Sequence, residues 1–473
     1  MRLENHHLLN ESIKLLYVDL FCGAGGTSTG VENARINDSQ CAKVIACVNH
    51  DKNAIASHSL NHPDTLHFTE DIRTLELSSL VEHVEKMRKL YPNALLVLWA
   101  SLECTNFSKA KGGQPRDGDS RTLAEHLFRY MDALQSEYIH IENVEEFMTW
   151  GPIDINGMPI KENKGDDYSV WVENVCNYGY GHEFRILNSA DYGAYTARKR
   201  LFIQFAKTGL PISWPEPTHK KVTLNTGLSK WKSVGDILEL NDEGVSIFSR
   251  KKPLSDNTLR RIYAGLLKFI AGGDKNFLSS YYGNGANVSS IEAPSPTVTT
   301  KDRIALVSPN FIDQQFGNSK PVSTNQPCGA LTTNPKYALV TVKHRHLMNP
   351  QFNSSGGSIE DPCFTLIARM DKMPPYLVVS EEGESLHRVT EKDSEHAIKI
   401  KEFMSAYRIY DVKMRMLKIS ELKVIMGFPK SYTLIGTQAD QKKFIGNAVE
   451  VTISRAMCES VSSGLDKLNK IAV

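Results

Sequence analysis

The sequence predicts a doubly wound α/β domain built on a mostly parallel sheet, together with a second, β-rich domain. Over the first 206 residues, short apolar runs alternate with amphipathic stretches, which is the pattern of strands and helices around a parallel sheet. Beyond that point, prolines, glycines and Ser/Thr-rich alternation replace the pattern. We therefore expect a first domain over 1–206, a second over 207–406, and a segment over 407–473 that returns to the first.

The individual elements follow from apolar periodicity. Amphipathic spacing predicts helices over 77–91 and 120–134, the latter capped by Asp119 or Ser120, and over 419–426 and 448–465 near the end of the chain. The charged stretch around 380–400 has little to bury, so we expect a surface loop there. Strands are predicted over 15–21, 44–48, 95–100, 138–144, 184–187 and 201–205.

An internal repeat occupies the second domain. Residues 277–307 contain Tyr-Gly-Asn, a Pro- and Thr-rich run and Ile-Ala-Leu-Val; residues 311–340 contain Phe-Gly-Asn, a similar run and Tyr-Ala-Leu-Val. A weaker third copy begins at Phe352 and reaches Tyr376 and the valines after it. The spacing predicts stacked β-hairpin units, the alternative being that Thr-rich strands merely share a composition.

Composition excludes several classes of protein. Lys plus Arg is 55 against 54 for Asp plus Glu, so any affinity for a polyanion must come from local clusters. The first residues are polar, and no uncharged run is long enough to cross a membrane. The eight cysteines form no Cys-x-x-Cys pair and have no companion His at zinc spacing, so we expect a cytoplasmic protein without a structural metal.

A glycine-rich loop follows the first predicted strand. It reads Asp19-Leu-Phe-Cys-Gly-Ala-Gly-Gly, and its glycines let the backbone approach a ligand closely. The dinucleotide fingerprint requires a further glycine at the position of Ser28, which disfavours a nicotinamide enzyme. A tight turn with no cofactor is the alternative for this loop taken alone.

Reactive side chains follow the later strands. Cys104 comes after an apolar strand and before a Lys- and Gly-rich segment, which is a setting for a reactive thiolate rather than a buried hydrophobe. Glu142 ends the next strand, where a carboxylate is costly to bury unless it is paired or functional. Arg198 and Arg200 are two positions apart and so share one side of an extended strand, although solvated surface arginines would also fit.

In this order, these residues, with Gly427-Phe-Pro and Gly446-Asn-Ala-Val near the end of the chain, closely resemble the C5 cytosine methyltransferase family over about 15–206 and 411–460. The resemblance implies S-adenosylmethionine as cofactor on a methyltransferase-type sheet, and 207–406 as a target-recognition domain for double-stranded DNA. It implies Cys104 as nucleophile, Glu142 as the carboxyl that holds the cytosine ring, and Arg198 and Arg200 as anchors for the base and its backbone. The cofactor-binding residues that it implies are Asp19, Phe21, Gly23, Gly25, Asn49, His50, Asp71, Ile72, Asn447 and Val449.

This chain departs from the family pattern at several of these positions. Leu102-Glu103-Cys104-Thr105 stands where Pro-Pro-Cys-Gln is usual, and a carboxylate beside a thiol disfavours the thiolate. Asn49 and His50 replace a ribose-binding glutamate and an adenine-stacking aromatic residue. Thr196-Ala-Arg-Lys-Arg keeps both arginines. These differences predict a divergent bacterial or phage branch that retains activity.

The expected reaction is methyl transfer to carbon 5 of a flipped-out cytosine through a covalent bond to Cys104, behind a loop over 108–120. We expect a monomer; whether a restriction endonuclease accompanies it stays open. An RNA cytosine methyltransferase is the nearest rival, separable by assays on tRNA and duplex DNA. A catalytically silent DNA-binding protein is the other, and detectable methyl transfer would exclude it.

Overall fold

The chain forms two compact units in a computed structural model, and each is described by itself. Unit 1 comprises Met1–Ile237, Pro362–Asp371 and Ile419–Val473, and unit 2 comprises Leu238–Asp361 and Lys372–Lys418. The residues that the structure describes are 12–102, 124–154, 156, 158–221, 227–239, 241–242, 245–269, 278–280, 287–289, 304–306, 311–314, 322–323, 337–339, 343–348, 356–366, 370, 375–382, 387–407 and 409–471.

A seven-stranded sheet forms the centre of unit 1. Its order is β5-β4-β1-β6-β7-β9-β8, and every neighbouring pair is parallel except those of β9 with β7 and β8. The expected mostly parallel sheet and all six expected strands are confirmed; only the short β5 was not predicted. The strands are β1 (Leu15–Leu20), β4 (Ala42–Val48), β5 (Leu66–Phe68), β6 (Leu95–Ser101), β7 (Tyr138–Asn143), β8 (Tyr180–Asn188) and β9 (Lys199–Lys207).

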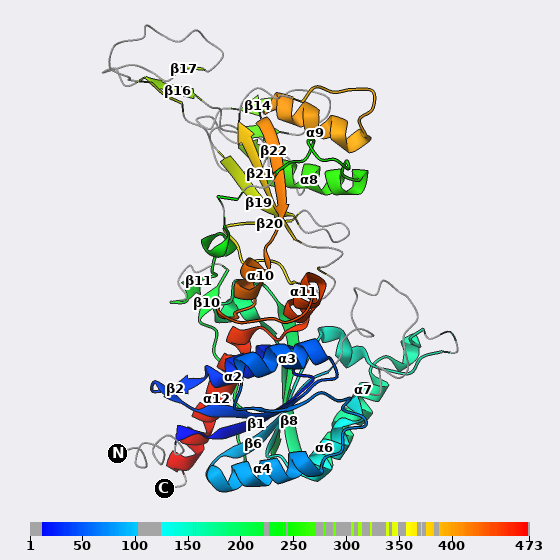
Figure 1. The fold of residues 1–473 in the computed structure, drawn as a ribbon, viewed down its shortest axis with the longest axis vertical. Coiled ribbons are helices and arrows are strands. Elements are labelled where there is room, and N and C mark those ends of the chain that lie inside the picture. The colour runs from blue at the N-terminus through cyan, green and yellow to red at the C-terminus, as the bar shows by residue number, and fades with distance from the viewer. Residues whose placement is uncertain are drawn as a thin grey trace. The chain divides into compact units, whose positions relative to one another are not determined.

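Helices cover both faces of this sheet because alternate residues of the buried strands point to opposite sides. Leu16 and Val18 of β1 join one apolar cluster with residues of α4 (Ser78–Leu90), α6 (Leu127–Leu134) and α7 (Asp166–Cys176). Leu15 and Tyr17 join another with residues of α2 (Gly26–Glu32) and α12 (Val451–Ile471), which run side by side (Figure 1). Among the described helices, none combines the length and apolar character needed to cross a lipid bilayer.

The helix expected over 120–134 is shorter than predicted. It begins at Leu127, so the prediction of Asp119 or Ser120 as its cap is wrong; both of those residues lie outside the described part of the chain. The carbonyl of Ala124 accepts a hydrogen bond from the indole of Trp171 on α7, at 3.0 Å. The amide of Phe128 donates to the carbonyl of Glu125, so the α-helical hydrogen bonding of α6 does not extend back to Ala124.

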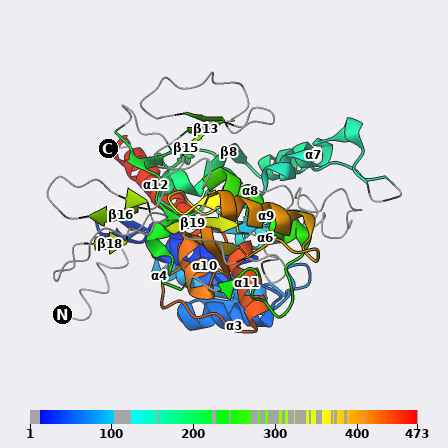
Figure 2. The same cartoon turned by 90° about the horizontal axis from the view of Figure 1, so that it is seen from above.

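Near the end of the chain, a segment with two short helices contacts the helix that follows β4 in unit 1. The two helices are α10 (Ile419–Ile425) and α11 (Gln438–Asn447). Lys443 of α11 forms an ion pair, at 3.1 Å, with Asp51 at the start of α3 (Lys52–Asn61). At the other end of α3, Asn61 exchanges two hydrogen bonds with the backbone of Thr433. α11 therefore lies beside α3 (Figure 2).

Unit 2 contains a five-stranded antiparallel sheet with two helices packed together. The sheet order is β12-β22-β21-β19-β20, and Ile400 and Met404 of one helix meet Ile262 and Leu266 of the other in a common core. Its elements are β12 (Val245–Ser246), α8 (Asp256–Phe269), β19 (Lys343–Met348), β20 (Gly357–Ser358), β21 (Tyr376–Glu382), α9 (Glu395–Ala406) and β22 (Ile409–Met416).

The prediction of a surface loop around 380–400 is wrong at both ends of that range. β21 continues to Glu382, and α9 begins at Glu395, with the hydroxyl of Ser394 accepting the amide hydrogen of Ala397. The charged residues concealed an apolar stripe, because Ala397, Ile400 and Met404 recur at helical spacing and are buried.

The internal repeat of the sequence is a repeat of strand topology. In each copy the first strand lies between the other two and is antiparallel to both, so each unit has three strands rather than the two of the expected hairpin. The third copy begins at Lys343, before the expected start at Phe352. The copies are β13 (Leu278–Ser280), β14 (Asn287–Ser289) and β15 (Ile304–Leu306); β16 (Phe311–Gln314), β17 (Val322–Ser323) and β18 (Tyr337–Leu339); and β19, β20 and β21.

Candidate active site

The candidate site lies at the carboxyl edge of the parallel strands of unit 1. Phe21 and Gly23 follow β1, Asn49 and His50 follow β4, and Asp71 follows β5. Because β5, β4 and β1 are adjacent and parallel, their carboxyl ends meet, and this edge is where open α/β sheets bind ligands.

The backbone conformation of the loop after β1 would allow a ligand to come close to its main chain. Phe21 and Gly23 have φ of 59° and 53°, in the left-handed region, and a Cβ added at Gly23 would meet no atom of the described residues within 4 Å. Gly26 is the opposite case, since its Cβ would collide with the carbonyl oxygen of Val449 and lie 3.0 Å from the Cβ of Ala448. Gly23 therefore borders open space, whereas Gly26 packs against the segment that follows α11.

That packing places Val449, a predicted cofactor-binding residue near the end of the chain, against the loop that contains Phe21, Gly23 and Gly25. Val449 is buried against the loop, and Asn447, the last residue of α11, is exposed. Gly25 is enclosed as well, because its Cβ would lie 3.1 Å from a ring carbon of His58. Only glycines at these positions allow this approach.

Asp71 is engaged by a neighbouring arginine. Its carboxylate accepts hydrogen bonds from the backbone and side chain of Arg73, and this contact lowers the pKa of Asp71 to about 2. The buried Ile72 turns its carbonyl toward Arg129 and Tyr130, at 3.0 and 2.9 Å. Asn49 uses its side-chain oxygen to accept the amide hydrogen of Asp51.

Asp19 is fully buried at the end of β1. The hydroxyl of Ser28 donates to its Oδ2 at 2.8 Å, and its Oδ1 has no hydrogen-bond partner among the described residues. Burial raises the pKa of Asp19 well above its usual value, and the bond from Ser28 opposes this only in part.

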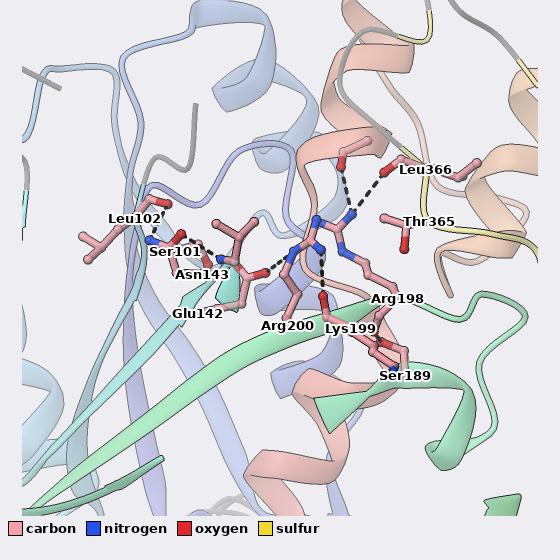
Figure 3. A network of polar contacts seen from close by, with 12 residues as sticks. Ser101, Leu102, Glu142, Asn143, Ser189, Arg198, Lys199, Arg200, Thr365 and Leu366 are labelled. Carbon is pink, nitrogen blue, oxygen red and sulfur yellow. Dashed lines mark hydrogen bonds and ion pairs between the residues drawn. The ribbon is translucent and has the colours of Figure 1, made fainter. Parts of the chain in front are cut away.

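Glu142 is the buried carboxylate of the site (Figure 3). Its Oε1 lies 3.2 Å from Nε of Arg200, and the two side chains are 7% and 17% exposed. The contact has the distance of an ion pair without hydrogen-bond geometry, so Oε1 still lacks a hydrogen-bond partner within the described part of the chain. A buried carboxylate oxygen of this kind can accept a hydrogen from a ligand.

Asn143 ties the ends of two strands together and was missed by sequence reasoning. Its side-chain amide donates to the carbonyl of Leu102 at 3.4 Å, next to Ser101, which is paired with Glu142 across β6 and β7. Leu102 leads directly to Glu103 and Cys104. Cys104, Glu103 and the loop expected over 108–120 lie outside the described residues.

The two arginines have different surroundings, although the sequence placed them on one side of a strand. Arg198 is buried and donates to the carbonyls of Leu366 and Gly446 at 3.1 and 3.2 Å, whereas Arg200 faces Glu142 (Figure 3). β9 begins only at Lys199, so Arg198 precedes the regular strand in which alternation applies.

Two further parts of the site were not identified from the sequence. The segment around Cys363, expected in the second domain, pairs with Thr196 and belongs to unit 1, and no sequence signal marks it. Glu450 is buried, and this burial raises its pKa to about 7, partly offset by backbone hydrogen bonds and by the charge of Arg198. Its position directly after Gly446-Asn-Ala-Val449 is the signal that could have found it.

Known methyltransferases resemble this chain over about half of its length. A Type II methyltransferase of Haemophilus parahaemolyticus, M1.HphI, is 25% identical over 270 residues, covering 56% of this chain and 63% of that protein. The Bacillus subtilis M.BsuRI is 28% identical over 241 residues, covering 48% and 51%. The matched region is therefore less than two thirds of the length of either relative.

A solved structure of an Entamoeba histolytica methyltransferase covers 96% of this chain and 99% of its own at 15% identity, with a TM-score of 0.45. The family model for C-5 cytosine-specific DNA methylases matches residues 15–463. That match includes the loop after β1, Glu142, both arginines and the segment after α11. The chain belongs to the C-5 cytosine-specific DNA methylase family.

Proposed function

We propose that this protein transfers a methyl group from S-adenosylmethionine to carbon 5 of a cytosine that is flipped out of duplex DNA. The observation that carries the proposal is the buried Glu142, held by Arg200 beside the strand end that leads to Cys104. Apart from the ion-pair contact with Arg200, Oε1 has no hydrogen-bond partner among the described residues, and it suits the amino group of cytosine, a hydrogen-bond donor.

The residues at the carboxyl edge fit the cofactor. Open space beside Gly23, with the positive φ of Phe21 and Gly23, leaves room for a ligand against the loop. Asn49, His50, Asp71 and Ile72 at the ends of β4 and β5 would take the nucleoside, with Asp71 shared between Arg73 and the adenine. Asp19 and Gly25 would hold the loop in its conformation. Asn447 and Val449, which follow from the other end of the chain, would complete the cofactor site. Bound S-adenosylmethionine supplies an electrophilic methyl group.

The side chains of this chain would act on the cytosine ring in sequence. The thiolate of Cys104 adds to carbon 6, and the electron pair of the ring double bond moves to carbon 5 while Glu142 binds ring nitrogen 3 and the amino group. Once carbon 5 carries the methyl group, its proton leaves to a base or water and the bond to sulfur breaks, which restores the ring. Arg200 keeps Glu142 oriented, and Arg198 fixes the backbone around Gly446 and Leu366.

The finer assignments belong to the same proposal. Unit 2, with its three strand repeats, would be the target-recognition domain, and the protein would act in the cytoplasm as a monomer, with or without a partner endonuclease. DNA affinity would come from local basic groups such as Lys109, Lys111 and Arg116 and residues 250–252 and 343–346. Phosphate contacts of this kind make affinity fall with salt, with a slope of roughly −0.9 per neutralised phosphate.

The test uses a pool of random duplexes in which 5-fluorocytosine replaces cytosine, incubated with the full chain and S-adenosylmethionine. Fluorine on carbon 5 cannot leave as a proton, so the protein should become covalently attached through Cys104, and the adduct should survive denaturation. Cys104→Ser should abolish the adduct. Glu142→Gln should slow it sharply while duplex binding persists.

Peptide mapping of the adduct by mass spectrometry decides the mechanism. Attachment through another cysteine would contradict the assignment of Cys104. Methylated cytosine without any adduct would contradict covalent catalysis and would point to an effect of the unusual Glu103 neighbour. Methyl transfer to tRNA but not to duplex DNA would replace the proposed substrate.

A further inference from the structure

Two thiols and two imidazoles come together at the loop after β1, and the proposed reaction gives none of these four side chains a role. The Sγ of Cys47 lies 3.7 Å from Nδ1 of His58, and the same Nδ1 lies 2.9 Å from Nε2 of His67. Ligand atoms of Cys22, Cys47 and His58 all lie within 4.8 Å of one another, and all three residues are buried. Cys22, Cys47 and His58 therefore form one compact set of ligand atoms, and Nε2 of His67 borders this set through its contact with His58.

The register of the sheet explains this convergence. Cys47 of β4 pairs with Asp19 of β1 on one side and with His67 of β5 on the other, so the three side chains form a row across parallel strands. Paired residues of a sheet point to the same face. Helix α3 lies over this row and contributes His58, and Cys22 comes two residues after the end of β1.

A hydrogen-bond chain orients His58 for coordination. Ser28 donates its only hydroxyl proton to Oδ2 of Asp19 at 2.8 Å, so its oxygen accepts from Nε2 of His58, also at 2.8 Å. A neutral imidazole with its proton on Nε2 has its lone pair on Nδ1, the atom that faces Cys47 and His67. A second ring nitrogen bonded outward toward a carboxylate is the usual arrangement for histidines that bind metals.

We propose that Cys22, Cys47, His58 and His67 form a binding site for a thiophilic divalent cation of the Zn²⁺ class. Two thiolates balance the charge of the ion, which suits a buried location, and four protein ligands give the closed tetrahedral set typical of structural zinc. Thiolate and imidazole ligands disfavour Mg²⁺ and Ca²⁺. The proposal does not depend on methyl transfer.

Such an ion would hold the loop after β1 in place. Cys22 lies between Phe21 and Gly23, and a Cβ at Gly25 would lie 3.1 Å from the ring of His58, so the ligands are in direct contact with the loop. A bound ion would join that loop to β4, β5 and α3. The sequence showed no zinc spacing because the ligands are scattered from position 22 to position 67 and meet only through strand pairing.

The test measures metal in the full chain purified with a thiol reductant. After incubation with Zn²⁺ and gel filtration, elemental analysis should find one tightly held ion per chain. Co²⁺ in its place should give a thiolate-to-metal charge-transfer band and the ligand-field bands of a tetrahedral site. Ser28→Ala leaves the four proposed ligands in place, removes the outer contact to His58 together with the hydrogen bond to Asp19, and should weaken the binding of Co²⁺ by about 10- to 100-fold.

Ligand variants and a matched control complete the test. Cys47→Ser should reduce the charge-transfer band, and His67→Gln, at a half-buried position, should weaken binding without removing a thiolate. Cys176→Ser removes a thiol that has a single imidazole neighbour, His182 at 3.4 Å, and should leave the stoichiometry and the spectrum unchanged.

Two results would overturn the proposal. The first is wild-type protein that retains no Zn²⁺ and shows no cobalt charge transfer, an outcome that requires no variant to fold. The second is a cobalt spectrum that Cys47→Ser leaves intact, which would reveal an ion bound elsewhere. Absence of methyl transfer would contradict the proposed function and would leave these metal measurements unaffected.

Discussion

Replacing Gly30 by alanine should destabilise unit 1, although alanine is the better helix former. Gly30 lies inside α2, where the change alone would stabilise the helix by about 0.5–1 kcal/mol. A Cβ at this position would lie 2.6 Å from the carbonyl oxygen of Val451 and 2.8 Å from the amide nitrogen of Arg455, both backbone atoms of α12. An ordinary contact begins at 3.4 Å, so α12 must move away by about 0.8 Å.

That movement would disturb the apolar cluster around α12, whose Ile453, Met457 and Val461 are fully or almost fully buried. Overpacking of a well-packed core costs about 1–3 kcal/mol. This exceeds the gain in helix propensity, so we expect a net loss and a fall in the melting temperature of about 2–4 °C for each kcal/mol.

Thermal unfolding followed by circular dichroism measures the effect, with Gly181→Ala as the matched control. Gly181 lies on the exposed part of β8, and its Cβ would meet nothing within 4 Å, so this variant should melt at or slightly above the wild-type temperature. If Gly30→Ala melted higher than wild type, as helix propensity alone requires, then α12 would not pack on α2 as described and the reasoning would be refuted.

Three further predictions follow from the two units. Arg200→Met should destabilise unit 1 by about 3–5 kcal/mol because it leaves the buried Glu142 unpaired, and adding Glu142→Met should recover part of that loss in urea unfolding; additive effects would contradict the pairing. Burial lowers the pKa of His140 to about 3, so the folded chain keeps this imidazole neutral while the unfolded chain binds a proton below about pH 6.5. Stability should therefore fall between about pH 6.5 and 3 by about 1.4 kcal/mol per pH unit, and His140→Phe should reduce that slope; equal slopes in urea titrations would refute it. Exchanging residues 270–361 of unit 2 with those of a relative should change the methylated site, mapped by bisulfite sequencing, without altering cofactor affinity; an unchanged site would place recognition elsewhere.

The elements that the sequence predicted well are those whose burial pattern is visible along the chain. β1, β4, β6, β7 and β9 are buried on both faces, so they appear as apolar runs, whereas β8 is largely exposed and showed only the short apolar run that ends at Leu187. All six strands that were expected are present. β5 was missed because Leu66–Phe68 is short and centred on a histidine. α9 was missed because charged residues fill its exposed face, so that composition concealed the apolar stripe.

For the candidate site, too, some features could be predicted from the sequence and others could not. The loop at Phe21 to Gly26, Glu142 and the pair of arginines were identifiable because each lies beside a strand end that the local pattern locates. The surroundings of each side chain were not, since a pattern along the chain cannot tell that Arg198 meets Leu366 and Gly446 while Arg200 meets Glu142.

The sequence alone therefore determined the class of fold, the order of its strands along the chain and the residues that mark its family. Tertiary structure decided which of those residues meet. Parallel strands bring together positions that are tens of residues apart, and their register alone places Asp19, Cys47 and His67 in one row. Periodicity along the chain reports burial, which is a local property, whereas strand register depends on contacts between distant segments and leaves no local mark.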